Sequence, residues 1–150
     1  MTIGFFNQHA PLYASNVALR NNHATLLKPG GKVAAYVGDQ VDGTDEYALT
    51  GLLVGTLNEG LARCRANAGD SVVVLPNHTE NISVADQMSS LVAGTTIIGA
   101  GYNLFSYTAT ASSFLVDVTD VALVGLNFDF TVIDNVVAPM TISADRCVIE

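Results

Sequence analysis

The stretch GDSVVVLPNHTENISV, from Gly69 to Val84, decides the fold. It holds a run of four apolar residues, Val72 to Leu75, which is typical of a buried strand. Pro76 ends the run, and a polar corner then leads into the short apolar segment around Ile82. The question is whether this is one buried strand of an α/β domain or the first unit of a repeat.

Apolar runs of the same kind return at a nearly constant spacing. Aligning Val73, Ile98, Val124 and Ile149 gives steps of 25, 26 and 25 residues. Because a period of this size with no helix between the strands is typical of stacked β-repeats, the spacing indicates a repeat architecture. The runs that carry the alignment are Ser71–Pro76, Thr95–Gly101, Val121–Phe128 and Arg146–Glu150.

A second set of short apolar runs lies between the first, at Asn81–Val84, Ser113–Val118 and Met140–Ala144. Leu115 and Thr141 are again 26 residues apart. A doubly wound α/β domain would need a helix between parallel strands, and no long amphipathic helix follows Ser71. The sequence therefore predicts an all-β fold, a short right-handed parallel β-helix of about three rungs of ~25 residues. In it, Val73, Ile98, Val124 and Ile149 are expected to point inward as one column.

One amphipathic helix is predicted before the first rung, over residues 56–66. Thr56 and Glu59 fit a capping box, and Leu57, Leu61 and Cys64 share one face. We expect this helix to cap the apolar end of the stack, which would otherwise expose unpaired strands. The predicted divisions are an extended N-terminal arm with a leading strand and loop (1–47), the capping helix region (48–70) and the rungs (71–150).

Charge is distributed unevenly along the 150 residues, whose net charge is −8. Residues 1–38 contain no acid, whereas from residue 39 onward fourteen acidic residues and three arginines give −11. Three basic residues in the arm are too few to indicate a nucleic-acid partner, which the acidic body would also repel. No apolar run reaches the ~18 residues of a membrane span, and no secretory signal is predicted. Cys64 and Cys147 have no metal-type spacing and are expected to be free thiols.

The strand and corner motifs resemble the start of parallel β-helix proteins encoded by tailed bacteriophages. The resemblance rests on GDSVVVLPNHTENIS, TTIIGAG and VTDVALVGLNF and covers roughly residues 57–150. It implies a structural part of a virus particle: a capsid decoration or cement protein, a head fibre or a tail spike. At the corner, Asn77 stands where the resemblance leads us to expect glycine; asparagine also tolerates positive φ.

Catalytic chemistry is weighed against structural roles at two places. Asp70, His78 and Glu80 could form an acid/base or metal site, but side chains of this kind also satisfy the backbone of tight corners. Groove hydrolysis would need facing carboxylates, for which the predicted rungs offer Asp117, Asp120, Asp129 and Asp134. The acidic segment 39–47 lacks a complete calcium-loop pattern. No catalytic residue, metal or cofactor is therefore predicted, and the chain is not expected to be an enzyme.

The predicted function is that of a capsid decoration or cement protein on the outer surface of the virion. The arm is expected to bind the major capsid protein, and the β-helix to self-associate, as a trimer by the resemblance. The alternative is the N-terminal part of a tail spike or head fibre that binds or cleaves host surface polysaccharide; an adhesin-like protein of a cell is a third reading. The predicted capsid contacts are Phe5, Phe6, Tyr13, Arg20, Lys28 and Lys32.

Overall fold

The computed structural model describes residues 30–38, 50–130 and 138–150. Short strands dominate these residues, and the single described helix, α2, has five residues. The elements are β1 (Val33–Val37), β2 (Leu53–Val54), α2 (Leu57–Leu61), β3 (Ser71–Val74), β4 (Thr79–Ile82), β5 (Thr96–Gly99), β6 (Leu104–Tyr107), β7 (Phe114–Val116), β8 (Ala122–Val124), β9 (Phe128–Asp129), β10 (Met140–Ile142) and β11 (Val148–Ile149).

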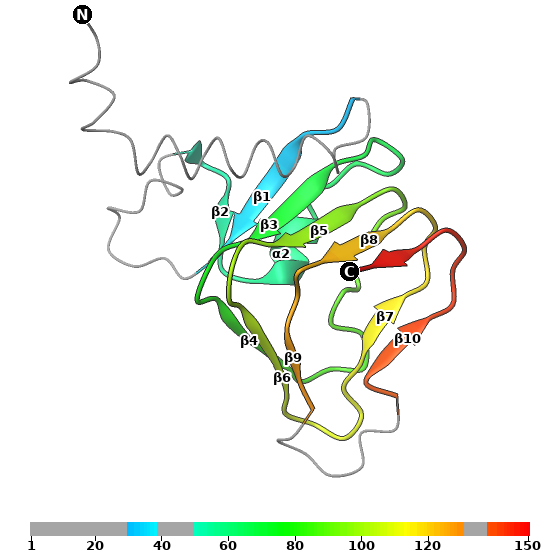
Figure 1. Cartoon of the computed structure of the whole chain (residues 1–150). Helices are drawn as coiled ribbons and strands as arrows, with labels where there is room; N and C mark the ends of the chain where they lie inside the picture. The colour runs from blue at the N-terminus through cyan, green and yellow to red at the C-terminus, as the bar shows by residue number, and fades with distance from the viewer. Residues whose placement is uncertain (1–29, 39–49, 131–137) are drawn as a thin grey trace, which may run out of the picture.

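The strands form three separate sheets, and every pairing within them is parallel (Figure 1). The largest has the order β11-β8-β5-β3-β1-β2, the second β4-β6-β9 and the third β10-β7. From β3 onward each strand pairs with one that lies about a repeat away in the sequence. The three sheets enclose one main core, into which α2 also packs.

Strands of the largest sheet pair in a simple register that follows the repeat. Val72 pairs with Ile97, Ile97 with Leu123, and Leu123 with Ile149, in steps of 25, 26 and 26 residues. Val72, Ile97 and Leu123 are buried in the main core, so they form the inward column. Each such side chain contributes ~1.5–3 kcal/mol by leaving water.

The predicted inward column was wrong by one residue. Val73, Ile98 and Val124 do pair in register, but Val73 belongs to a second cluster on the opposite face, with Leu53 and Leu75. Because side chains alternate between the two faces of a strand, a shift of one residue exchanges the faces. The run VVVL is apolar on both faces, so its sequence does not distinguish them.

The predicted right-handed parallel β-helix of about three rungs is also wrong as a description of this chain. The described strands remain in three separate sheets and do not close into a continuous helix or barrel. The sheet that begins with β3 in the prediction also includes β1 and β2, which precede it. The strands are only two to five residues long, and irregular segments separate the sheets. The extended arm of the prediction lies outside the described residues, and the three divisions of the chain stay a prediction.

The repeat contains three strands where the sequence indicated two. Leu104–Tyr107 forms β6, which pairs with β4, so β4 does not pair with β7. The predicted pairing of Leu115 with Thr141 is confirmed in β7 and β10. The segment LFSY of β6 was missed because its alternation of apolar and polar residues is only four residues long.

Aromatic side chains fill the space between the two smaller sheets. Phe105 of β6, Phe114 of β7 and Phe128 of β9 contact one another with ring centroids 5.0–6.0 Å apart. The buried Tyr107 hydroxyl donates to the carbonyl of Pro139, next to β10, and so connects the two sheets. Burial raises the pKa of Tyr107 to about 12, so the hydroxyl keeps the proton that it donates.

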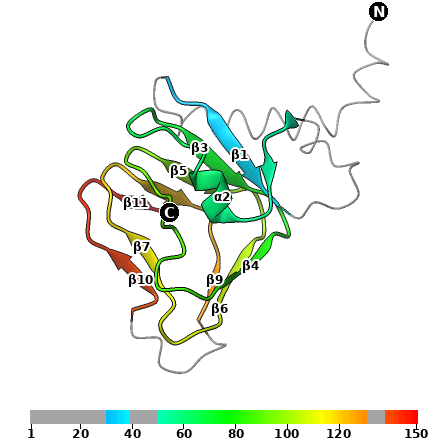
Figure 2. The same cartoon turned by 180° about the vertical axis from the view of Figure 1, so that it is seen from behind.

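Helix α2 is shorter than predicted, although its start is confirmed. The Thr56 hydroxyl accepts from the Glu59 backbone N–H at 3.3 Å, and the Glu59 carboxylate accepts from the Thr56 N–H at 3.2 Å. The helix ends at Leu61, where the next backbone bonds become i→i−3 turns. Leu57 and Leu61 face the core beneath β1 and β3, on the inner side of the largest sheet (Figure 2).

Two glycines and one asparagine allow β5 and β8 to approach closely at their ends. The buried Asn103 amide donates to the carbonyls of Gly101 and Gly125, each at 3.0 Å, and its oxygen accepts from the Asn127 N–H at 3.1 Å. A Cβ on Gly99 would lie 2.0 Å from the Gly125 carbonyl oxygen. Glycine is therefore required at position 99, since this oxygen belongs to the backbone and the Asn103 amide holds it in place.

Replacing this glycine is expected to disrupt the stack. Gly99→Ala should lower the free energy of unfolding by about 2–4 kcal/mol, because a methyl group and two backbones cannot share the space. Gly55→Ala is the matched control, since its added Cβ would lie 3.7 Å from the nearest atom outside its chain neighbours. Urea denaturation measures both variants, and equal stabilities would contradict the close approach.

Candidate functional site

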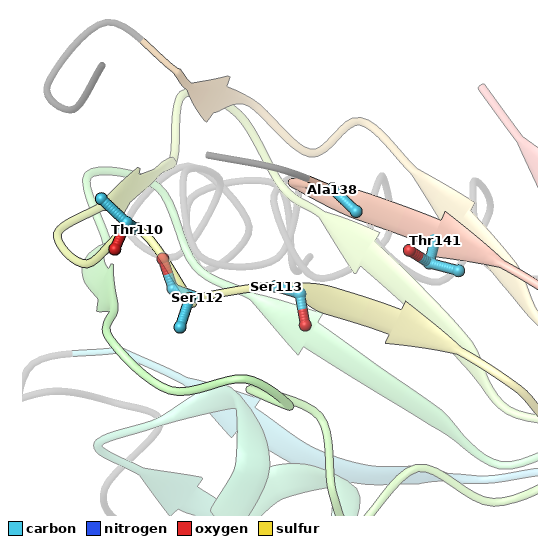
Figure 3. Close-up of a pocket in the computed structure, with 6 residues that line it drawn as sticks. Thr110, Ser112, Ser113, Ala138 and Thr141 are labelled. Atoms are coloured by element: carbon cyan, nitrogen blue, oxygen red, sulfur yellow. The ribbon is translucent and has the colours of Figure 1, made fainter. Parts of the chain in front are cut away.

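An open pocket of about 390 Å³ lies beside β7 and β10 (Figure 3). Its lining consists of small residues: Thr110, Ala111, Ser112, Ser113, Ala138 and Thr141. The buried Ser112 hydroxyl already donates to the Ala109 carbonyl. None of these six residues is ionisable, so they supply hydrogen bonds for a neutral ligand but no acid, base or activated nucleophile.

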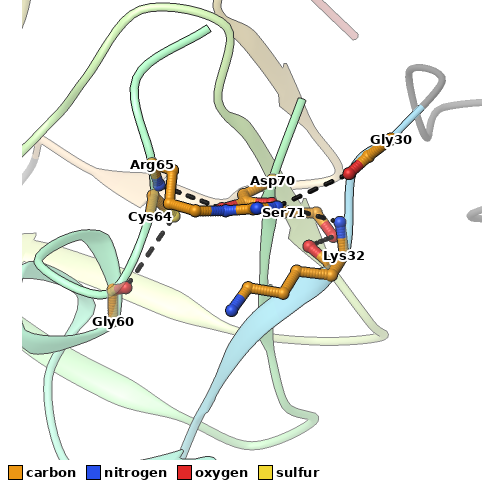
Figure 4. Close-up of polar contacts among 7 residues, drawn as sticks. All are labelled: Gly30, Lys32, Gly60, Cys64, Arg65, Asp70 and Ser71. Atoms are coloured by element: carbon orange, nitrogen blue, oxygen red, sulfur yellow. Dashed lines mark hydrogen bonds and ion pairs between the residues drawn. The ribbon is translucent and has the colours of Figure 1, made fainter. Parts of the chain in front are cut away.

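A buried carboxylate, Asp70, holds together three backbone segments at the start of β3 (Figure 4). Its oxygens accept from the Arg65 side chain at 2.8 and 2.9 Å and from the Arg65 backbone N–H at 2.9 Å. The Lys32 N–H, just before β1, donates to the same carboxylate at 3.2 Å. The hydrogen bond from the Arg65 side chain lowers the pKa of Asp70 to about 2. Asp70 thus joins β1 and β3 to the segment after α2.

A second buried polar cluster lies at the corner before β4. Oε2 of Glu80 accepts from the Leu57 N–H at 2.8 Å and lies 3.2 Å from Nε2 of His78. The other carboxylate oxygen of Glu80 accepts from the Gln87 amide at 3.0 Å. Glu80 therefore connects the start of α2 to β4 and to the segment that follows β4. As a carboxylate only accepts, the imidazole presents Nε2–H to it.

The three residues weighed as a catalytic set do not converge. His78 and Glu80 contact each other, whereas Asp70 binds Arg65 and Lys32 elsewhere. The His78 side chain is only 1% exposed, so a substrate cannot reach it. Its Nδ1 has no hydrogen-bond partner in the described part of the chain. The geometry supports the structural alternative, in which both clusters satisfy backbone groups at corners.

The acids considered for groove catalysis do not form a facing pair either. Asp120 forms an ion pair with Arg146, with contacts of 2.6 and 2.8 Å, while Asp117 is exposed on the segment after β7. Asp134 and the acidic segment 39–47 lie outside the described residues. Within the described ranges, no group of three His, Cys, Asp or Glu side chains could hold a metal ion.

Cys64 and Cys147 are both free thiols, as predicted. Burial raises the pKa of Cys64 to about 11, and the neighbouring Asp70 charge acts in the same direction. At neutral pH, Cys64 therefore remains a thiol, and it is suited to neither nucleophilic attack nor metal binding.

Most of the predicted capsid contacts fall beyond the part of the chain that can be examined. Phe5, Phe6, Tyr13, Arg20 and Lys28 lie outside the described residues. Lys32 is described and exposed, and only its backbone N–H has a role, in binding Asp70. These six residues remain a prediction.

The sequence analysis missed the exposed apolar surface where the three sheets end. The last strand of each sheet in chain order, β9, β10 or β11, is also its outermost strand on that side (Figure 1). Within the described ranges these strands have no partner on their outer edges. Phe130, Ile142, Val148 and Ile149, which lie in or next to them, are each 44–50% exposed. We call these four residues, with the strand edges beside them, the terminal edge.

The backbone of β11 shows how the terminal edge is presented. The N–H groups of Val148 and Glu150 both donate to β8-side carbonyls at 2.9 Å. Because alternate residues of a parallel strand bond to the same neighbour, the N–H and C=O of Ile149 face the other way. An exposed edge that is also apolar can accept a further strand. The one signal for it in the sequence was the strand-like run at residues 146–150.

Comparisons with known proteins do not assign the chain to a family: no family model, curated protein or solved structure matches it. Among the described residues, no helix has the length and apolar character needed to cross a membrane.

The Asp70 contacts give a testable dependence of stability on pH. Because the folded-state pKa of Asp70 is about 2, below the ~3.9 of an unfolded chain, its contribution is full above pH ~5 and is lost as pH falls toward 2. Asp70→Asn should destabilise the fold by about 1–3 kcal/mol at pH 7. The difference from the parent protein should shrink at low pH.

Chemical denaturation between pH 2 and pH 7 measures this dependence, with Asp117→Asn as the control because Asp117 is an exposed carboxylate. The control should follow the parent protein. A constant gap between Asp70→Asn and the parent at all pH values would show that the ion pair does not stabilise the fold.

Proposed function

We propose that this chain is a structural protein of a tailed-bacteriophage particle, a capsid decoration or cement protein. Its arm would bind the major capsid protein, and its copies would associate through their sheets. The observation that carries the assembly role is the terminal edge, where strand edges and four large apolar side chains are exposed together. The phage setting is supported by the resemblance of the corner and strand motifs.

The use of the buried polar groups supports a structural role over a catalytic one. Asp70 and Glu80 each accept hydrogen bonds from backbone N–H groups of other elements. Removing such a carboxylate from this network would leave buried donors unpaired, which costs ~1–3 kcal/mol for each donor. The buried charged and polar side chains at the corners are thus placed to stabilise a rigid stack that other molecules can bind.

The second candidate is the N-terminal part of a tail spike or head fibre that acts on host surface polysaccharide. The hydroxyl-lined pocket between Thr110 and Thr141 is the observation that favours it, because hydroxyl groups can hydrogen-bond a neutral sugar. The lining favours binding over cleavage, since hydrolysis needs a pair of carboxylates.

Binding to purified heads tests the first candidate. Replacing Phe5, Phe6 and Tyr13 together by alanine should reduce occupancy on the heads by about tenfold or more, because aromatic anchors dominate such interfaces. Tyr102→Ala is the control, since Tyr102 is exposed on the body of the protein at 63%. Quantitative mass spectrometry of sedimented particles gives the occupancy. Full occupancy by the triple variant would contradict the arm contact, and a tail position at low copy number would favour the second candidate.

A further inference from the structure

The terminal edge presents acidic as well as apolar side chains. Asp145 and Glu150 are exposed on either side of Val148 and Ile149 in the sequence, and Asp129 precedes Phe130. The one described cation in this part of the chain, Arg146, is bound to Asp120. A strand that covers this edge should therefore carry apolar side chains and positive charge, and no carboxylates.

The chain itself contains a segment of this composition. Residues 16–29, NVALRNNHATLLKP, contain Arg20 and Lys28, four large aliphatic side chains and no acid. Residues 1–15 also lack acids but contain neither lysine nor arginine, and they hold the aromatic residues assigned to the capsid. Charge complementarity thus distinguishes the two halves of the arm.

The topology favours a second copy as the source of this segment. Residues 16–29 lead into Gly30 and β1, and β3, β5 and β8 stand between β1 and β11 in the largest sheet. To lie on β11 of the same chain, the segment would have to turn back past those strands. A neighbouring copy can present the segment without such a reversal.

We infer that the terminal edge of one copy binds residues 16–29 of a second copy, which add a strand beside β11. This inference deepens the self-association in the proposed function by naming the segment and the surface. Ile149 supplies the outward-facing N–H and C=O groups, and Asp145 and Glu150 attract Arg20 and Lys28. Because the contact runs from the arm of one copy to the edge of the next, it is heterologous and can close into a ring.

Two measurements on the full-length protein test the inference. Light scattering should show a mass that rises above the monomer with protein concentration. Fluorescent peptides of residues 16–29 and 1–15 should differ in binding to the full-length protein: the first should bind and the second should bind about tenfold more weakly. Adding unlabelled peptide 16–29 should lower the mass, and added salt should weaken its binding because exposed charges contribute.

Matched variants locate the contact. Ile149→Lys should weaken binding of peptide 16–29 by about tenfold, because it places a cation where Arg20 and Lys28 would lie. Val84→Lys should change binding by less than about twofold, since Val84 is equally exposed but lies after β4, away from the terminal edge. Circular dichroism should show that both variants fold, as both positions are exposed.

Several results would overturn the inference. These are a monomeric mass at every concentration, equal binding by the two peptides, and equal effects of Ile149→Lys and Val84→Lys. A monomer whose edge is already blocked, so that neither peptide binds, would assign the segment to its own chain and would also overturn it. Head binding is measured separately. Loss of head binding with intact copy-to-copy binding would count against the proposed function alone.

Discussion

The parallel pairing of strands one repeat apart is the constraint on which the rest of the structure depends. Val72, Ile97 and Leu123 lie in one column because their strands pair in register, and that column forms the floor of the main core. A shift of one residue in any pairing would turn these side chains to the other face. The core, the position of α2 and the exposure of the last strands all follow from this register.

Register of this kind needs buried backbone groups to be satisfied where the strands turn. Asn103 provides this between β5 and β8, Asp70 between β1 and β3, and Glu80 between α2 and β4. Each uses a side chain to replace hydrogen bonds that regular secondary structure would otherwise supply. A stack with such corners has well-defined ends, and the terminal edge is the end at which Ile149 still offers an outward-facing backbone.

The sequence predicted the parts of the fold that depend on local pattern. The strand around Val72, the capping box of Thr56 and Glu59, and the pairing of Leu115 with Thr141 are all visible in spacing and residue type. Asn77 adopts positive φ at the corner, as expected for an asparagine in place of glycine. Long-range features were beyond it: VVVL is apolar on both faces, and closure into a helix depends on segments with no periodic signal. The His78–Glu80 contact was one of two open readings, because spacing does not show which groups converge.

Methyl contacts in solution test the central register most directly. In protein labelled with ¹³C at valine, leucine and isoleucine methyl groups, NOE cross-peaks should join Val72 to Ile97 and Ile97 to Leu123. Val72 and Leu123 are two strand spacings apart, ~10 Å, and should show no cross-peak of that strength. If the Ile97 methyl groups contacted neither Val72 nor Leu123, the parallel stack described above would be incorrect.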